Sequence, residues 1–167
     1  MPLDKQSLLK RIYRSFPSDI PVPSLHIYEA EAIDWYLYKT DPEKFQEIRS
    51  KKYDFPWPEV PRKHLTDNQH SLSYLEPEGI LYYIPRVMVD FIENFQHSIP
   101  EHNLGGPEMW LHESLIYGFE KSESFELFNE GQRETITEFI LYVSTLTDYF
   151  SEIKKYLENE WAPKGGI

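Results

Sequence analysis

The segment from Pro77 to Phe95 constrains the fold of this chain more than any other. Its apolar side chains recur every three or four residues, at Ile80, Tyr83, Ile84, Val87, Met88, Phe91, Ile92 and Phe95. Because an α-helix has about 3.6 residues per turn, this spacing puts all of them on one helical face. Pro85 lacks an N–H and clashes with the preceding turn, so a kink or a break is expected near Leu81–Pro85.

Three helices are predicted ahead of this segment, over residues 4–15, 24–39 and 41–51. Asp4 is the expected N-cap of the first. The third begins with Asp41 as N-cap and Pro42 at the first helical position, a strong start signal. Between the third helix and Pro77, prolines around Trp57 predict a surface loop pinned by that side chain, with a short helix over residues 59–65 or 67–75.

The C-terminal part predicts a helix over residues 108–119 and a long last helix over residues 131–161. The last helix has an apolar stripe that includes Ile136, Phe139, Ile140 and Val143. No segment shows the alternating pattern of a strand. We therefore predict an all-α fold, a compact single domain over residues 1–167 with five to seven helices and a long C-terminal helix.

Composition excludes several classes of protein. The 167 residues contain no cysteine, which excludes disulfides, thiolate metal sites and cysteine nucleophiles. With 28 acidic and 17 basic residues the formal charge is −11, which argues against nucleic acid as a direct partner. There is no secretory signal, and no apolar run approaches the roughly 20 residues of a membrane span. We expect a soluble, cytoplasmic protein with no membrane partner.

No motif for catalysis, cofactor binding or metal binding stands out, so no catalytic residue, metal ligand or cofactor is predicted. His112-Glu113 begins like the helical zinc motif H-E-x-x-H, but Ile116 occupies the position of the second histidine. A metal site near His97, Glu101, His102 and His112 stays open as an alternative, and solvated or capping histidines are the commoner outcome.

The negative charge is concentrated late in the chain. Residues 1–100 hold 15 acids and 12 bases, a net charge of −3, whereas residues 101–167 hold 13 acids and 5 bases, a net charge of −8. Such a surface can steer a basic partner, although a solvated helix face is the plainer interpretation. The candidate partner-binding residues are Glu120, Glu123, Glu126, Glu134, Glu138, Asp148 and Glu152.

Aromatic residues form 16% of the chain, and 12 of them are tyrosines. Most of these rings are expected to lie in the core. The alternative is that some tyrosine and tryptophan side chains form a binding surface, where these residue types are often hot spots.

The stretch from Leu72 to Pro85 resembles a family of small, uncharacterised bacterial proteins that carries a domain-of-unknown-function label. The family pattern reads roughly Leu-Ser-Phe-Leu-Thr-Pro-Glu-Gly-Phe-Arg-Tyr-Tyr-Leu-Pro, and here Ile80 and Leu81 replace its Phe and Arg. A weaker likeness covers residues 127–133, and Asp34-Trp35 is also similar. The resemblance implies a compact helical domain and gives no activity.

The favoured function is that of an acidic stoichiometric binding protein. Small size, acidity and the lack of catalytic motifs are typical of an immunity protein that neutralises a basic bacterial toxin domain by direct binding. The alternatives are a His/Glu metal-dependent enzyme and a regulatory or scaffold protein of unknown partner. The sequence leaves the oligomeric state open.

Overall fold

The structure, a computed structural model, describes residues 3–68, 71, 74–94 and 126–146. Every regular element in these ranges is helical, which confirms the predicted all-α class. In chain order the elements are α1 (Lys5–Ser15), α2 (Ile27–Asp34), α3 (Leu37–Thr40), α4 (Pro42–Ser50), the 3-10 turn η1 (Trp57–Glu59), α5 (Arg62–Asp67), α6 (Pro77–Asn94) and α9 (Glu130–Ser144).

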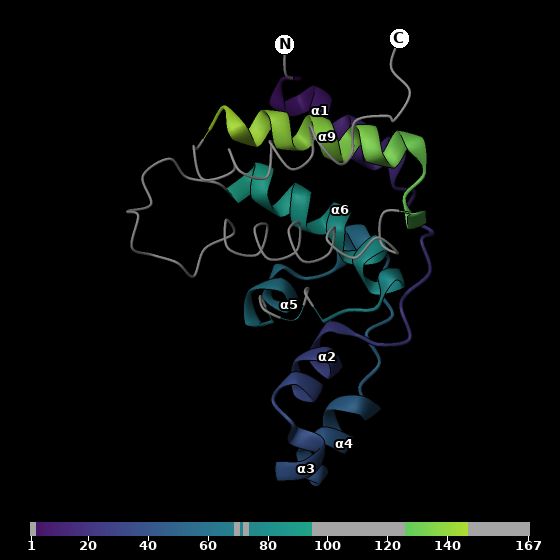
Figure 1. Cartoon of the computed structure of the whole chain (residues 1–167), viewed down its shortest axis with the longest axis vertical. Helices are drawn as coiled ribbons and strands as arrows, with labels where there is room; N and C mark the ends of the chain where they lie inside the picture. Colours follow the sequence, from purple (N-terminus) through teal and green to yellow (C-terminus); the bar gives the residue numbers. More distant parts are fainter. Residues whose placement is uncertain (1–2, 69–70, 72–73, 95–125, 147–167) are drawn as a thin grey trace.

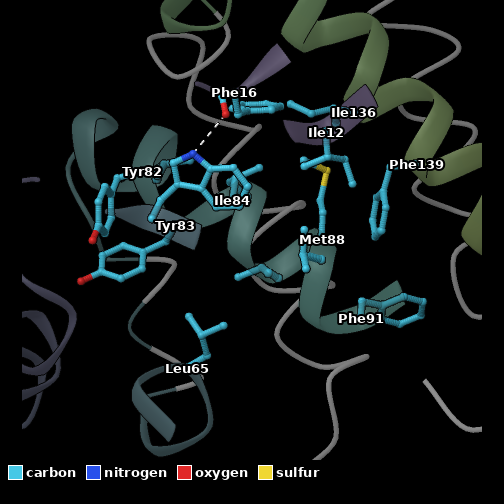
Figure 2. Close-up of a cluster of buried hydrophobic side chains, with 14 of the residues drawn as sticks. Ile12, Phe16, Leu65, Tyr82, Tyr83, Ile84, Met88, Phe91, Ile136 and Phe139 are labelled. Atoms are coloured by element: carbon cyan, nitrogen blue, oxygen red, sulfur yellow. Dashed lines mark hydrogen bonds between the residues drawn. The ribbon is translucent and has the colours of Figure 1, made fainter. Parts of the chain in front are cut away.

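Helices α1, α6 and α9 form one end of the molecule, here called the three-helix body (Figure 1). Apolar faces of all three meet in a shared core, in which Met88 and Phe91 of α6 lie near Ile12 of α1 and Phe139 of α9 (Figure 2). The rings of Phe91 and Phe139 meet edge to face with their centroids 5.9 Å apart. The predicted central segment is therefore the centre of the core.

Of the kink or break expected near Leu81–Pro85, the break does not occur: α6 runs from Pro77 to Asn94 as one helix. A proline inside a helix costs about 3 kcal/mol. Twelve residues of α6 are buried, Pro85 among them, and each large apolar side chain buried contributes roughly 1.5–3 kcal/mol. Burial on this scale outweighs the missing hydrogen bond. Gly79 has a packing role, since a Cβ there would lie 3.1 Å from the Leu75 side chain.

Helices α2, α3 and α4 lie at the opposite end of the molecule and are here called the α2–α4 lobe (Figure 1). Helix α4 begins as predicted, with the Asp41 carboxylate accepting a hydrogen bond from the Lys44 amide at 3.1 Å. The prediction of a single helix over residues 24–39 is wrong, because the backbone is not helical between the end of α2 and the start of α3. Neither α3 nor α4 buries a single residue completely.

Two side chains, Trp57 and Tyr83, tie the connecting segments to the body through long-range hydrogen bonds. The predicted pin at Trp57 is confirmed: its side chain is fully buried, and its indole Nε1 donates to the backbone oxygens of Phe16 and Pro17 at 3.1 and 3.0 Å. The Tyr83 hydroxyl of α6 accepts a hydrogen bond from the Ile27 amide at 3.2 Å and so joins the start of α2 to the body.

Helix α9 starts one residue before the predicted position, at a capping box between Asn129 and Gln132. It ends at Ser144. The helix was predicted to run to residue 161, and residues 147–161 of that prediction lie outside the described residues. The helix predicted over residues 108–119 also lies outside them. Among the helices that are described, none has the length and apolar character needed to cross a membrane.

Candidate functional site

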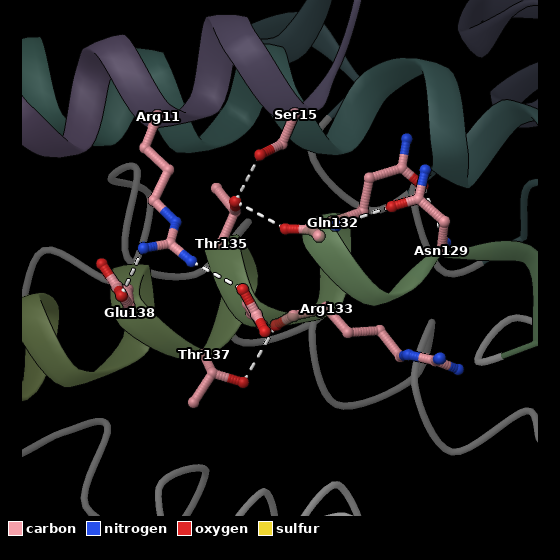
Figure 3. Close-up of polar contacts among 10 residues, drawn as sticks. Arg11, Ser15, Asn129, Gln132, Arg133, Thr135, Thr137 and Glu138 are labelled. Atoms are coloured by element: carbon pink, nitrogen blue, oxygen red, sulfur yellow. Dashed lines mark hydrogen bonds and ion pairs between the residues drawn. The ribbon is translucent and has the colours of Figure 1, made fainter.

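Two of the predicted partner-binding acids, Glu134 and Glu138, form ion pairs with another helix of the same chain. Arg11 of α1 reaches both from above α9, with its Nη2 2.8 Å from a Glu134 carboxylate oxygen and its Nη1 2.7 Å from Glu138 (Figure 3). Nearby, the hydroxyls of Ser15 and Thr135 lie 2.7 Å apart. This part of α9 is therefore a helix–helix contact with α1, which neutralises part of the expected negative face.

The other predicted acids are not gathered into one site by the described residues. Glu126 is exposed. The remaining four lie outside the described residues: Glu120, Glu123, Asp148 and Glu152. The histidines and the glutamate of the alternative metal site, His97, Glu101, His102 and His112, lie outside them too. Within the described ranges no three metal-ligating side chains converge.

Large apolar side chains gather instead on the surface of the α2–α4 lobe. The described residues include eight large apolar side chains that are exposed. Four of these lie between residues 33 and 38, where α2 ends and α3 begins, and a fifth, Tyr74, lines the same pocket as three of them. Trp35 is the most exposed, at 65%. We call this group the aromatic surface; it consists of Ile33, Trp35, Tyr36, Tyr38 and Tyr74.

The backbone at Tyr36 sets the shape of the aromatic surface. Its φ of 55° and ψ of 27° lie in the left-handed region, and it is the one described non-glycine residue with positive φ. This conformation costs a residue with a Cβ roughly 1–2 kcal/mol. It ends the helical path after Asp34 and turns Tyr36 outward. Strain of this kind is often found at binding sites.

An open pocket lies within the aromatic surface, with a volume of about 220 Å³. Its lining is apolar and aromatic except for one carboxylate. The lining residues are Leu25, Ala30, Ile33, Asp34, Tyr36, Tyr38 and Tyr74. Within the described part of the chain, the Asp34 side chain makes no hydrogen bond and no ion pair, so its charge is available to a ligand.

The Trp35 ring is held in place although it is exposed. Its indole Nε1 donates to a Glu31 carboxylate oxygen at 2.7 Å. The other Glu31 oxygen accepts a hydrogen bond from the Ser71 hydroxyl. One Glu31 oxygen thus holds the indole edge and the other is anchored by Ser71, which leaves the flat face of the ring for a partner. A fixed ring loses little conformational entropy on binding.

Two rings of the aromatic surface, Tyr36 and Tyr38, bind a cation from the chain itself, the side chain of Lys39. The Lys39 ammonium lies 5.5 Å from the centroid of the Tyr36 ring and 5.4 Å from that of Tyr38. Both distances are within the range of a cation–π interaction. The negative faces of the two tyrosines therefore attract a positive charge in this geometry.

A second aromatic group lies where the lobe meets the loop before η1. His64 contacts the rings of Tyr28, Tyr53 and Phe55 edge to face, and His26 packs on Tyr53 at 4.8 Å. The Nδ1 of His26 accepts a hydrogen bond from the Glu29 amide and caps α2. Burial lowers the pKa of both imidazoles, and attraction to Glu29 and Asp67 partly opposes that shift.

The body contains one fully buried carboxylate, Asp90 of α6. One of its oxygens accepts hydrogen bonds from Arg62 at 3.0 Å and from Asn94 at 2.9 Å, and the other oxygen has no hydrogen-bond partner among the residues that the structure describes. Burial raises the pKa of the Asp90 carboxyl, while the guanidinium groups of Arg62 and Arg86 oppose the shift. Its contacts tie α6 to α5, so we assign it a structural role.

One sequence feature indicates the aromatic surface, although it was not used in predicting the helix over residues 24–39. Trp35, Tyr36, Leu37 and Tyr38 are consecutive, so on a regular helix they would cover all of its sides. A helix at the surface buries only one side, and some of these rings had to be exposed. The histidine group and the Asp90 contacts carry no such signal, because their partners are far apart in sequence.

Comparison with known proteins places the chain in one family. No curated protein and no solved structure matches it. A family of unknown function does match, over residues 4–164 and thus nearly the whole chain. This confirms the expectation of an uncharacterised family. The chain therefore belongs to the family of unknown function DUF6714.

Proposed function

We propose that this protein is a stoichiometric binding protein whose partner docks on the aromatic surface. The supporting observation is the concentration of exposed apolar side chains around one small lobe, of which Trp35 is the most exposed. Single exposed apolar residues are ordinary, but a group of them marks an interaction site more often than chance. Tryptophan and tyrosine are also the residues most enriched among binding hot spots.

The specific form we propose is an immunity protein that neutralises a basic toxin domain. The formal charge of −11 favours association with a basic partner, because long-range attraction raises the rate of encounter. Aromatic anchors would then supply most of the affinity. In this proposal the acidic C-terminal part steers the partner, and the aromatic surface holds it.

The proposal is tested by expressing the protein together with the product of the gene beside its own. We expect co-purification in equal amounts and rescue of growth when that product is toxic. Trp35→Ala should weaken binding by about 2 kcal/mol, roughly thirtyfold in Kd, because it removes the largest anchor.

Tyr13→Ala is the matched control, since Tyr13 is also an exposed aromatic residue but lies on α1, stacked on Trp57. It should leave binding unchanged. No partner and no protection would refute the immunity function. Equal binding by Trp35→Ala and the wild-type protein would show that the partner docks elsewhere.

A further inference from the structure

The pocket in the aromatic surface combines two features that together select a cation. Three tyrosines are among its lining residues, and the faces of tyrosine rings carry partial negative charge. Asp34 adds a full negative charge within the same lining. An uncharged apolar ligand would bury this carboxylate without a partner, which is unfavourable. A cationic ligand gains from both features.

The contacts of Lys39 show which rings attract the cation. Its ammonium lies within 5.5 Å of the Tyr36 and Tyr38 centroids, whereas no ion pair links it to Asp34. The two rings lie 6.1 Å apart and are inclined by 38°. Lys39 is exposed, so its interaction with the rings can be exchanged for that of an incoming group at little cost.

A guanidinium fits this pocket better than a second ammonium does. It is planar and weakly hydrated, so it can stack on a tyrosine ring while its N–H groups donate to a carboxylate. An ammonium is a compact and strongly hydrated charge, and Lys39 already supplies one to the same rings. We propose that the pocket formed by Asp34, Tyr36, Tyr38 and Tyr74 receives an arginine side chain of the partner protein; this inference rests on the proposed function.

The pocket can be tested without the partner. The probe is arginine blocked at both ends, N-acetyl-arginine methylamide, titrated into the isotopically labelled protein and followed by NMR. We expect saturable shifts of the amides of residues 33–38 at millimolar probe, as befits a single side chain. The citrulline analogue has the same shape without the charge and should cause no shifts. Equal shifts with both probes would overturn the inference.

Two variants identify the groups involved. Asp34→Asn should weaken arginine binding about fivefold to tenfold by removing the carboxylate, and Lys39→Gln should strengthen it by removing the competing ammonium. Asp19→Asn, which changes an exposed aspartate outside the pocket, is the control and should have no effect. The NMR spectrum itself reports whether each variant is folded. Unchanged binding by Asp34→Asn, or weaker binding by Lys39→Gln, would contradict the inference.

Partner binding separates this inference from the proposed function. If Trp35→Ala loses the partner while Asp34→Asn binds it with unchanged affinity, the arginine pocket is refuted and the binding function stands. If both variants lose affinity, the inference is supported. If no partner is found but the blocked arginine binds through Asp34, the pocket chemistry holds and its assignment to a protein partner is refuted.

Discussion

The three-helix body and the α2–α4 lobe use their aromatic residues in opposite ways. In the body, Phe91 and Phe139 are completely shielded from solvent and meet edge to face. In the lobe, Trp35 and Tyr36 expose more than half of their surfaces, at 65% and 58%. Aromatic content alone therefore does not distinguish a core from a binding surface. The difference lies in whether a second element covers the ring.

The two regions also differ in how their helices are held. Helices α1, α6 and α9 each bury residues on a broad apolar face. Helices α3 and α4 bury none completely, and the contacts that hold them include an edge-to-face pair between Tyr38 and Phe45 and the exposed ion pair of Arg49 with Glu29. We infer that the body provides most of the stability and that the lobe is available for recognition.

The largest expected effect is the loss of stability when a body ring is removed. Phe139→Ala should lower the free energy of unfolding by about 3–5 kcal/mol, because it removes buried contacts and leaves a cavity. Trp35→Ala, its counterpart in the lobe, should cost under about 1 kcal/mol, since an exposed ring contributes little to folding. Urea denaturation followed by circular dichroism measures both. Similar losses for the two variants would remove the distinction between body and lobe.

Two arginines allow the same comparison for ion pairs. Arg11 in the body contacts two carboxylates and is 32% exposed, whereas Arg49 in the lobe lies 3.3 Å from Glu29 and is 61% exposed. Arg11→Ala should cost about 1 kcal/mol, and Arg49→Ala under about 0.5 kcal/mol, because water and salt screen exposed pairs. The thermal midpoint at low and high salt checks this. An equal cost for both would show that the ion pairs of Arg11 with α9 stabilise the fold no more than an exposed surface pair does.

Lowering the pH should weaken the contact between the start of α2 and α5, where His26 and His64 lie. The pKa values of His26 and His64 are lowered by burial, so the unfolded chain takes up protons first as the pH falls through about 6.5. Stability should therefore fall from about pH 7.5 to about pH 5.5. The change should be shallow, because attraction to Glu29 and Asp67 opposes the effect of burial.

The control for this pH effect is His64→Phe, which keeps an aromatic ring in the group but cannot be protonated. Urea midpoints of the wild-type protein and the variant, measured across the same pH range, separate this group from the histidines elsewhere in the chain. The variant should lose less stability on acidification. An identical pH dependence would show that His64 does not contribute.

Features that depend on residues close in sequence were predictable, and those that depend on tertiary contacts were not. The starts of α1 and α4 followed from Asp4, Asp41 and Pro42, because capping is a local interaction. Periodicity identified α6, but it could not show that burial would keep the helix intact through Pro85. The contact of Arg11 with α9 joins residues more than 120 positions apart and left no pattern to find.

The smallest expected effect tests whether the left-handed residue serves binding at the expense of stability. Tyr36→Gly relieves about 1–2 kcal/mol of conformational strain and gives back part of it, about 0.5–1 kcal/mol, through the greater freedom of glycine in the unfolded chain. We expect a net gain of about 0.5 kcal/mol in the free energy of unfolding. Tyr38→Gly, two residues later inside α3, should instead be destabilising, because its backbone is helical and its ring packs on Phe45.

Both variants should bind the partner less well, since each removes a tyrosine that lines the pocket. A loss of stability in Tyr36→Gly would mean that the exposed ring stabilises the fold, and the aromatic surface would then be part of the lobe's own packing.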